Sequence, residues 1–340
     1  MDGDTRVLGS RAGGGGGRPT RRLLLLGGAA AGLAVLVDHG LRVDTPPPPP
    51  PVPTRRPAPD EAVLLAAIAR LSRLARAAGE VPTGSRAALV QQVQSLADQQ
   101  LRTLRGRLTN AGVPTAVIDS AVAATPTGTA SAAPSPSETE SPATGTPSPT
   151  TAAGSRPRTP EALGQLMLDS LRRDDWDALA TATPATRQLL ATAYAERLAA
   201  ALLLGAEPPA PAPSRARPDL MARTEALAYA FEVVAAQSTG AQRRAAEATL
   251  AQLTHLQDAV AGTTPTEPAG WSLPYAVTTP PAARRLATDT LSAAVDAAAA
   301  SLRADATAAS LEDTAHWSAR IQAQAVGWGL PLTAFPGATP

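Results

Sequence analysis

The chain has 340 residues, a net charge of +1, only 3% aromatic residues and no cysteine. The absence of cysteine excludes disulfides, thiolate catalysis and cysteine-ligated metals. All 30 basic residues are arginines, and they alternate with acids on the expected helix faces. The sequence therefore lacks the basic stripe of a nucleic-acid-binding protein.

The N-terminus has the pattern of an export signal or membrane anchor. Residues 1–22 form a basic segment, and the apolar run 23–37 follows directly. As a helix this run reaches about 22 Å, less than the ~30 Å hydrocarbon core of a bilayer. Thr20-Arg21-Arg22 resembles a twin-arginine signal. Because no convincing small-x-small cleavage site follows, we favour an uncleaved cell-membrane anchor, cytoplasmic at its basic end, over a secreted product.

Three segments have the composition of linkers. Residues 38–59 include six consecutive prolines, which predict a stiff polyproline spacer that holds the next element away from the membrane. Residues 123–158 contain almost only Ala, Thr, Pro, Ser and Gly and are expected to be disordered. Residues 206–217 form a shorter Pro/Ala linker.

Between the linkers, the apolar spacing predicts two helical hairpins. Helices over 60–78 and 85–111 make up the first, within residues 60–112. Helices over 160–180 and 184–204 make up the second, within 159–205, and each begins at a Thr-Pro pair. The hairpins either associate with each other across the disordered linker or dock separately on the C-terminal region. Their expected apolar faces comprise Leu64, Ile68, Leu71, Ala75, Val93, Leu101, Leu104, Leu108, Leu163, Leu166, Met167 and Leu171.

Four further helices are predicted in residues 218–337, with a long connection in the middle. Their ranges are 218–237, 241–261, 280–303 and 306–326. The 18 residues of the middle connection can span roughly 60 Å, so the third helix can start parallel to the second. A single long crossover is the topology of a ferritin-like bundle. The predicted fold class is therefore all-α, with a ferritin-like four-helix bundle preceded by helical hairpins and disordered linkers.

Several short motifs support this assignment. They are Glu225-Ala-Leu-Ala-Tyr229, Leu273-Pro274-Tyr275 followed by Ala283-Arg-Arg-Leu-Ala287, and Phe335-Pro336-Gly337. With these motifs, residues 218–337 resemble an uncharacterised ferritin-like domain of exported actinobacterial proteins. The resemblance implies a four-helix fold and an envelope location, and it implies no activity because the family's role is unassigned. The chain departs from the expected pattern at Ala226, where an acid–His pair would follow the first Glu, and at Asp289 and Asp296, which replace Glu.

A ferritin-like bundle normally holds two metal ions on carboxylates and Glu-x-x-His pairs. This chain has no Glu-x-x-His, and Asp313-x-x-His316 is its only acid–His pair at that spacing. The predicted metal ligands, for iron or manganese, are Glu225, Asp289, Asp313 and His316. Further candidates are Glu232, Glu247, His255, Asp296 and Glu312. Against a metal site, Glu247 and Asp289 can form ordinary surface pairs with the arginines four residues earlier, and His255 can be an interface residue.

The leading hypothesis is a non-catalytic, membrane-tethered, extracytoplasmic helical protein that binds or scaffolds envelope partners, without cofactor or catalytic residues. The alternative is a degenerate ferritin-like di-metal protein that binds or oxidises iron or manganese. A third possibility is small-ligand binding in an apolar pocket between helices. The aromatic residues Trp271, Tyr275, Trp317 and Trp328 either anchor a partner or plug the bundle and its crossover.

Overall fold

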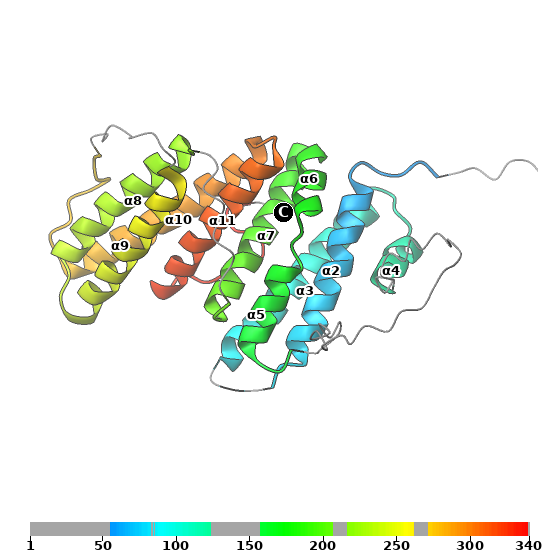
Figure 1. Cartoon of the computed structure of the whole chain (residues 1–340), viewed down its shortest axis with the longest axis horizontal. Helices are drawn as coiled ribbons and strands as arrows, with labels where there is room; N and C mark the ends of the chain where they lie inside the picture. Colours follow the sequence, from blue (N-terminus) through cyan, green and yellow to red (C-terminus); the bar gives the residue numbers. More distant parts are fainter. Residues whose placement is uncertain are drawn as a thin grey trace, which may run out of the picture. The chain divides into compact units, whose positions relative to one another are not determined.

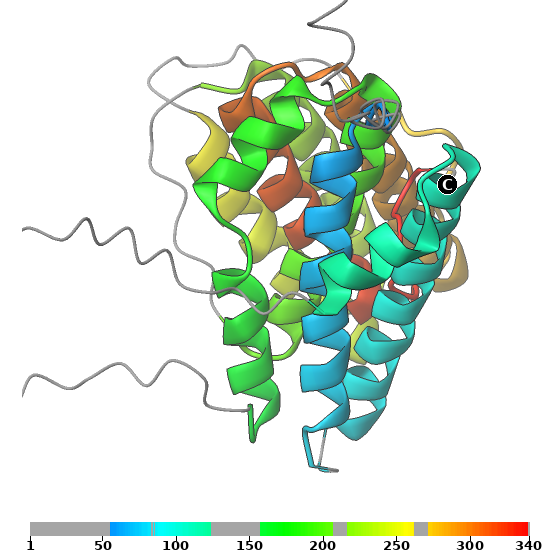
Figure 2. The ribbon, with the colours of Figure 1, turned by 90° about the vertical axis from the view of Figure 1, so that its right-hand side faces the viewer.

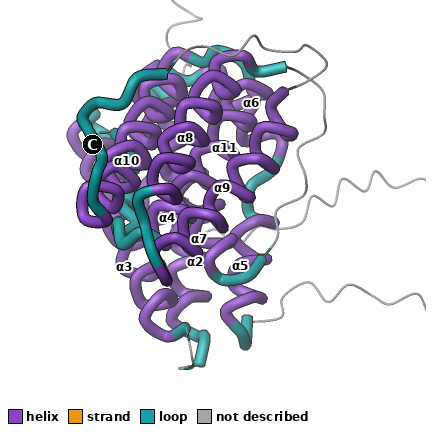
Figure 3. Tube along the Cα trace, turned by 90° about the vertical axis from the view of Figure 1, so that its left-hand side faces the viewer, coloured by secondary structure: helices purple, strands orange, loops and turns teal. Residues whose placement is uncertain are grey.

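Every regular element in the described part of the chain is a helix, which confirms the all-α prediction (Figure 3). The computed structural model describes residues 55–82, 84, 86–123, 157–206, 216–261 and 271–338. All of these except Arg55 belong to one compact unit, Arg56–Pro340. The predicted anchor, residues 38–54 of the predicted proline spacer and nearly all of the predicted disordered linker lie outside the described residues. Within those residues, no helix is long and apolar enough to cross a membrane.

Ten helices occur in the described ranges. In chain order they are α2 (Glu61–Gly79), α3 (Ala87–Asn110), α4 (Thr115–Ala123), α5 (Pro160–Asp169), α6 (Arg173–Thr181), α7 (Pro184–Leu203), α8 (Pro218–Ala236), α9 (Gly240–Ala261), α10 (Pro280–Ala304) and α11 (Ala308–Gly327). Seven of the eight predicted helices agree with these bounds to within two residues at each end. The short helix α4, which packs against α2 beside α3 (Figure 2), was not predicted.

The prediction of one helix over 160–180 is wrong, because the chain breaks into α5 and α6. Ser170 ends α5, and its hydroxyl donates to the carbonyl of Met167 at 2.7 Å. Asp175 then accepts a hydrogen bond of 2.9 Å from the backbone N–H of Arg172, which caps the start of α6. Asp175 also pairs with Arg70 of α2. Leu166, expected on the apolar face, is 37% exposed as a consequence of this break.

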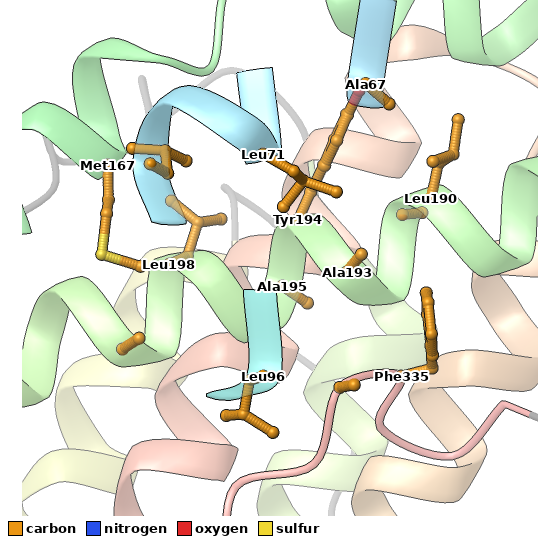
Figure 4. Close-up of a cluster of buried hydrophobic side chains, with 14 of the residues drawn as sticks. Ala67, Leu71, Leu96, Met167, Leu190, Ala193, Tyr194, Ala195, Leu198 and Phe335 are labelled. Carbon is orange, nitrogen blue, oxygen red and sulfur yellow. The ribbon is translucent and has the colours of Figure 1, made fainter. Parts of the chain in front are cut away.

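Helix α7 lies between α11 on one side and α5 on the other (Figure 1), and it is buried all round. Every residue from 189 to 201 is buried. Helices α5, α6, α10 and α11 pack directly against it. Figure 4 shows Tyr194 and Leu198 of α7 beside Leu71 of α2 and Met167 of α5. A helix that is apolar on all sides requires neighbours on all sides, and α7 has them.

The two predicted hairpins share one core, and that core continues onto the C-terminal region. Side chains of α2, α3, α5, α6 and α7 form one buried cluster. The same cluster includes Leu302 of α10, Leu311 of α11 and Phe335 near the C-terminus. Helices α10 and α11 therefore each serve two cores, because their other faces belong to a second cluster with α8 and α9.

In the second cluster, α8 packs against α9 and α10, and α10 packs against α11. The residues at 4-3-4-3 spacing on the inner face of α8 are all buried: Leu220, Thr224, Leu227, Phe231 and Val234. After α11, the chain returns along α10, and Gly337 fixes the close approach. Its φ is +67°, and a Cβ there would lie 2.8 Å from the Cα of Asp296. The Phe335-Pro336-Gly337 motif therefore has a packing role, with Phe335 buried and Gly337 against α10.

Candidate functional site

The predicted metal ligands lie on three helices, and Asp289 has other partners. It pairs with Arg285 at 3.4 Å and accepts a hydrogen bond of 3.0 Å from the hydroxyl of Tyr275. The Arg285 guanidinium also lies over the Tyr275 ring, 5.2 Å from its centroid. Asp289 thus holds the crossover segment onto α10, and the predicted surface pair with Arg285 is present.

Asp313 belongs to an ion cluster at the start of α8. Its carboxylate lies 3.5 Å from Nη1 of Arg217, whose guanidinium also pairs with Asp219 and Asp305. The same arginine donates to the hydroxyl of Thr314 at 3.0 Å. Arg217 thereby joins the start of α8 to the junction between α10 and α11. Asp313, the acid of the pair with metal-ligand spacing, is thus held beside an arginine.

His316 is half-buried on α11. Its burial, with a smaller contribution from the nearby Arg320 cation, lowers the pKa of the imidazole to about 4. Glu225 is half-buried on α8, and no ion pair or hydrogen bond joins its side chain to another described residue. Within the described ranges, no group of three or more Asp, Glu and His side chains is placed to hold a metal ion.

The remaining candidate ligands are distributed over helix surfaces. Glu247 pairs with Arg243 at 3.1 Å, as the sequence predicts. Exposed side chains are found at Glu232, His255 and Asp296, and Glu312 is half-buried.

Two buried tryptophans, Trp317 and Trp328, fill the space between the C-terminal helices. Trp317 is 1% exposed and donates its indole N–H to Thr224 at 2.9 Å. Trp328 is buried and donates to Thr249 at 3.1 Å. A partner cannot use these two rings as surface anchors, since both are buried among helices of the same chain. Trp271 and Tyr275 remain half-exposed.

Sequence reasoning missed a buried polar centre on α7. Glu196 is 3% exposed, and its Oε2 accepts a hydrogen bond of 2.9 Å from Gln100 of α3. Burial raises the pKa of the Glu196 carboxyl to about 7, against the opposing effects of Gln100 and Arg197. The same Gln100 nitrogen donates to the carbonyl of Ala334 at 2.7 Å. One amide therefore connects α3, α7 and the C-terminal segment.

Arg197 occupies the other half of this centre. It donates to the hydroxyl of Ser170 at 3.2 Å, and it lies 5.3 Å from the centroid of the Tyr194 ring. Glu196 and Arg197 both face a cavity of about 10 Å³, near the minimum for one water molecule. The centre is too closed for a ligand. Its signal in the sequence is a Glu-Arg pair between apolar runs in the second half of the helix.

Two larger cavities open to the surface. The first, which we name the C-terminal pocket, lies between α10, α11 and the segment after α11. It has a volume of about 250 Å³ and is lined by Ser292, Val295, Asp296, Gln322, Ala325, Leu330, Pro331, Leu332, Thr333, Pro336 and Gly337. The second also measures about 250 Å³ and lies between α7, α9 and α11, where Arg320 and two glutamines border leucine side chains. Both have the apolar walls and few polar groups of a small-ligand site.

Comparisons with known proteins identify no relative: no family model, no curated protein and no solved structure matches this chain.

Proposed function

We propose that the protein is a non-catalytic, membrane-tethered, extracytoplasmic helical binding or scaffold protein. The observation that carries this proposal is how its acidic residues are used. Asp289 and Asp313, two of the predicted metal ligands, connect segments of the fold: Asp289 accepts a hydrogen bond from Tyr275 of the crossover, and Asp313 pairs with Arg217 at the start of α8. The open cavities, by contrast, combine apolar walls with a few polar side chains, among them Asp296 and Arg320, and they suit ligand binding.

The tether is proposed from the sequence of residues 1–59. A basic segment, an apolar run and a polyproline spacer, in that order, suit a protein held at the outer face of the cell membrane. Protease treatment of intact cells tests this arrangement. We expect the helical region to be degraded from outside while the basic N-terminus stays protected. Protection of the whole chain until the cells are lysed would contradict it.

We also propose that α8–α11 form a ferritin-like bundle that has lost its metal centre. In support, α8 contacts α9 and α10, and α11 contacts α10 and α9. The long connection over 262–279 suits the single crossover of that topology. In a ferritin-like bundle the metal would lie between the inner faces, where this chain places Thr224, Trp317 and Ile321.

Metal loading of the full-length protein in detergent tests the non-catalytic role. Iron, manganese or zinc is added, free metal is removed, and bound metal and dioxygen consumption are measured beside Glu225→Ala and His316→Ala. We expect no stoichiometric metal binding that depends on these side chains, and no dioxygen consumption that depends on added metal. Stoichiometric metal that is lost in both variants would overturn the proposal in favour of the di-metal alternative.

A further inference from the structure

The C-terminal pocket contains a buried hydrogen-bond acceptor without a partner. Gln322 of α11 is 4% exposed, and its Nε2 donates to the hydroxyl of Ser318 at 3.1 Å. Its Oε1 is buried and accepts no hydrogen bond in the described part of the protein. An unsatisfied buried acceptor is costly and uncommon in folded proteins. This oxygen is closed to solvent in the free protein, so a molecule in the pocket donates to it only when the Gln322 amide turns toward the pocket that its side chain lines.

An unpaired carboxylate lines the same pocket. Asp296 of α10 is exposed, and no cation or donor of the described residues pairs with it. Asp289, seven residues earlier on the same helix, is by contrast held by Arg285 and Tyr275. The pocket therefore combines a negative charge with an unsatisfied acceptor, and both favour a ligand that is cationic and carries N–H donors.

Apart from Ser292 and Thr333, the other walls of the pocket are apolar. Ala325 and Leu332 are buried beside it, and Val295 and Leu330 complete the lining. A volume of about 250 Å³ admits a short hydrocarbon body together with one polar head. The wall formed by the C-terminal segment is anchored, since Phe335 is buried and Gly337 packs on the backbone of α10.

We propose that the C-terminal pocket binds a small organic ammonium ion. Its N–H groups donate to Oε1 of Gln322, its charge lies toward Asp296, and its hydrocarbon part packs against Leu330 and Leu332. The inference rests on the proposed binding function and names the ligand class for it. A neutral alcohol of the same size lacks the charge, and a carboxylate carries the wrong sign.

Ligand-observed NMR titration of the full-length protein in detergent micelles tests the ligand class. The probes are n-butylammonium chloride, 1-butanol and sodium butyrate at constant ionic strength, with protein-free micelles as the blank. We expect saturable binding of butylammonium alone. Butanol or butyrate binding equally tightly, or no saturation by butylammonium, would overturn the inference.

Substitutions of the pocket residues test whether butylammonium binds in the C-terminal pocket. Asp296→Asn and Gln322→Leu are each expected to raise the dissociation constant for butylammonium about tenfold. The matched control is Asp289→Asn, which removes the same charge from α10 outside the pocket and should leave the constant within about twofold. Equal effects of Asp296→Asn and Asp289→Asn would contradict the assignment. Asp296 is exposed, so this comparison remains decisive even if Gln322→Leu loosens the core.

The outcomes for this inference and for the proposed function are separable. Protein without stoichiometric metal or turnover that also fails to bind butylammonium overturns only the ammonium site. Metal that depends on Glu225 and His316 overturns the non-catalytic function, whatever the amine titration shows.

Discussion

Trp317 donates its indole N–H to the hydroxyl of Thr224 at 2.9 Å, between α11 and α8. Both residues are almost completely buried. Thr224 in turn donates to the carbonyl of Leu220 at 2.7 Å, so its hydroxyl is satisfied in both directions. This hydrogen bond joins the buried faces of α8 and α11, where it serves packing between helices.

Thr224→Val keeps the side-chain shape and removes the acceptor. The indole N–H of Trp317 is then buried without a partner, and we expect the free energy of unfolding to fall by about 1–3 kcal/mol. Urea denaturation measures the loss. The control is Thr254→Val, since Thr254 is exposed and its hydroxyl bonds only within its own helix. Similar losses in the two variants would contradict the role of the Trp317 hydrogen bond.

The raised pKa of Glu196 predicts a stability that falls with pH. The pKa of about 7 keeps the buried carboxyl protonated up to about pH 7, whereas in the unfolded chain the carboxyl ionises near its ordinary pKa of 4.5. The unfolded state therefore binds fewer protons between these values, and the free energy of unfolding contributed by Glu196 declines across pH 4.5–7. The shift corresponds to about 3 kcal/mol.

Urea denaturation of wild type and Glu196→Gln across this range isolates the effect. The stability of wild type minus that of the variant should fall from pH 4.5 to 7 and then level off. Glu247→Gln, which alters an exposed carboxylate, is the control. A difference that does not change with pH would show that Glu196 is ionised in the folded protein.

His316 predicts that stability rises with pH, which is opposite to the effect of Glu196. Burial lowers the pKa of its imidazole to about 4 and keeps it neutral down to that pH, whereas the ordinary pKa of histidine is 6.5. The unfolded state binds more protons between these values, so stability from His316 rises as pH increases from 4 to 6.5. Wild type minus His316→Gln should show this rise in urea denaturation. His255→Gln removes an exposed imidazole as the control, and an equal pH dependence there would count against burial as the cause.

The Arg217 cluster predicts a large loss when the cation is removed. Arg217→Met leaves Asp219, Asp305 and Asp313 without their shared partner, and we expect about 3 kcal/mol of destabilisation. Arg243→Met breaks an exposed pair four residues apart and should cost less than about 0.5 kcal/mol. Thermal denaturation of both variants checks the contrast. Equal melting temperatures would contradict the bridging role of Arg217.

Gly337→Ala tests the close approach of the C-terminal segment to α10. The added Cβ meets backbone at 2.8 Å, and φ is +67°. Gly112→Ala is the matched control, because Gly112 also has a positive φ, +81°, with nothing within 4 Å of the added Cβ. Backbone strain alone costs about 1–2 kcal/mol, and we expect Gly337→Ala to lose more than that in urea denaturation. Equal losses of unfolding free energy in the two variants would show that the C-terminal segment moves away from α10 without destabilising the protein.

Much of the helical framework was predictable because helix signals are local. Thr159 and Thr279 cap α5 and α10 by accepting from backbone N–H groups three residues later, as Thr-Pro starts predict. Thr183 shows the limit of such signals. Helix α7 begins after it as expected, yet its hydroxyl donates to Asp60 of α2 at 2.5 Å in place of capping α7. This hydrogen bond to a residue distant in the sequence depends on how α2 and α7 pack together, and a local sequence signal does not predict it.

By itself, the sequence determined the all-α class and the inner faces of most helices, since apolar periodicity records which side of a helix is buried. Only the tertiary structure decided the use of the polar residues. Glu196 and Arg197 are buried because other helices surround α7. The spacing of apolar residues along one helix does not reveal how many other helices pack against it. Asp313 pairs with Arg217 across nearly a hundred residues. Such pairs depend on how helices pack together, and no local spacing in the chain encodes that packing.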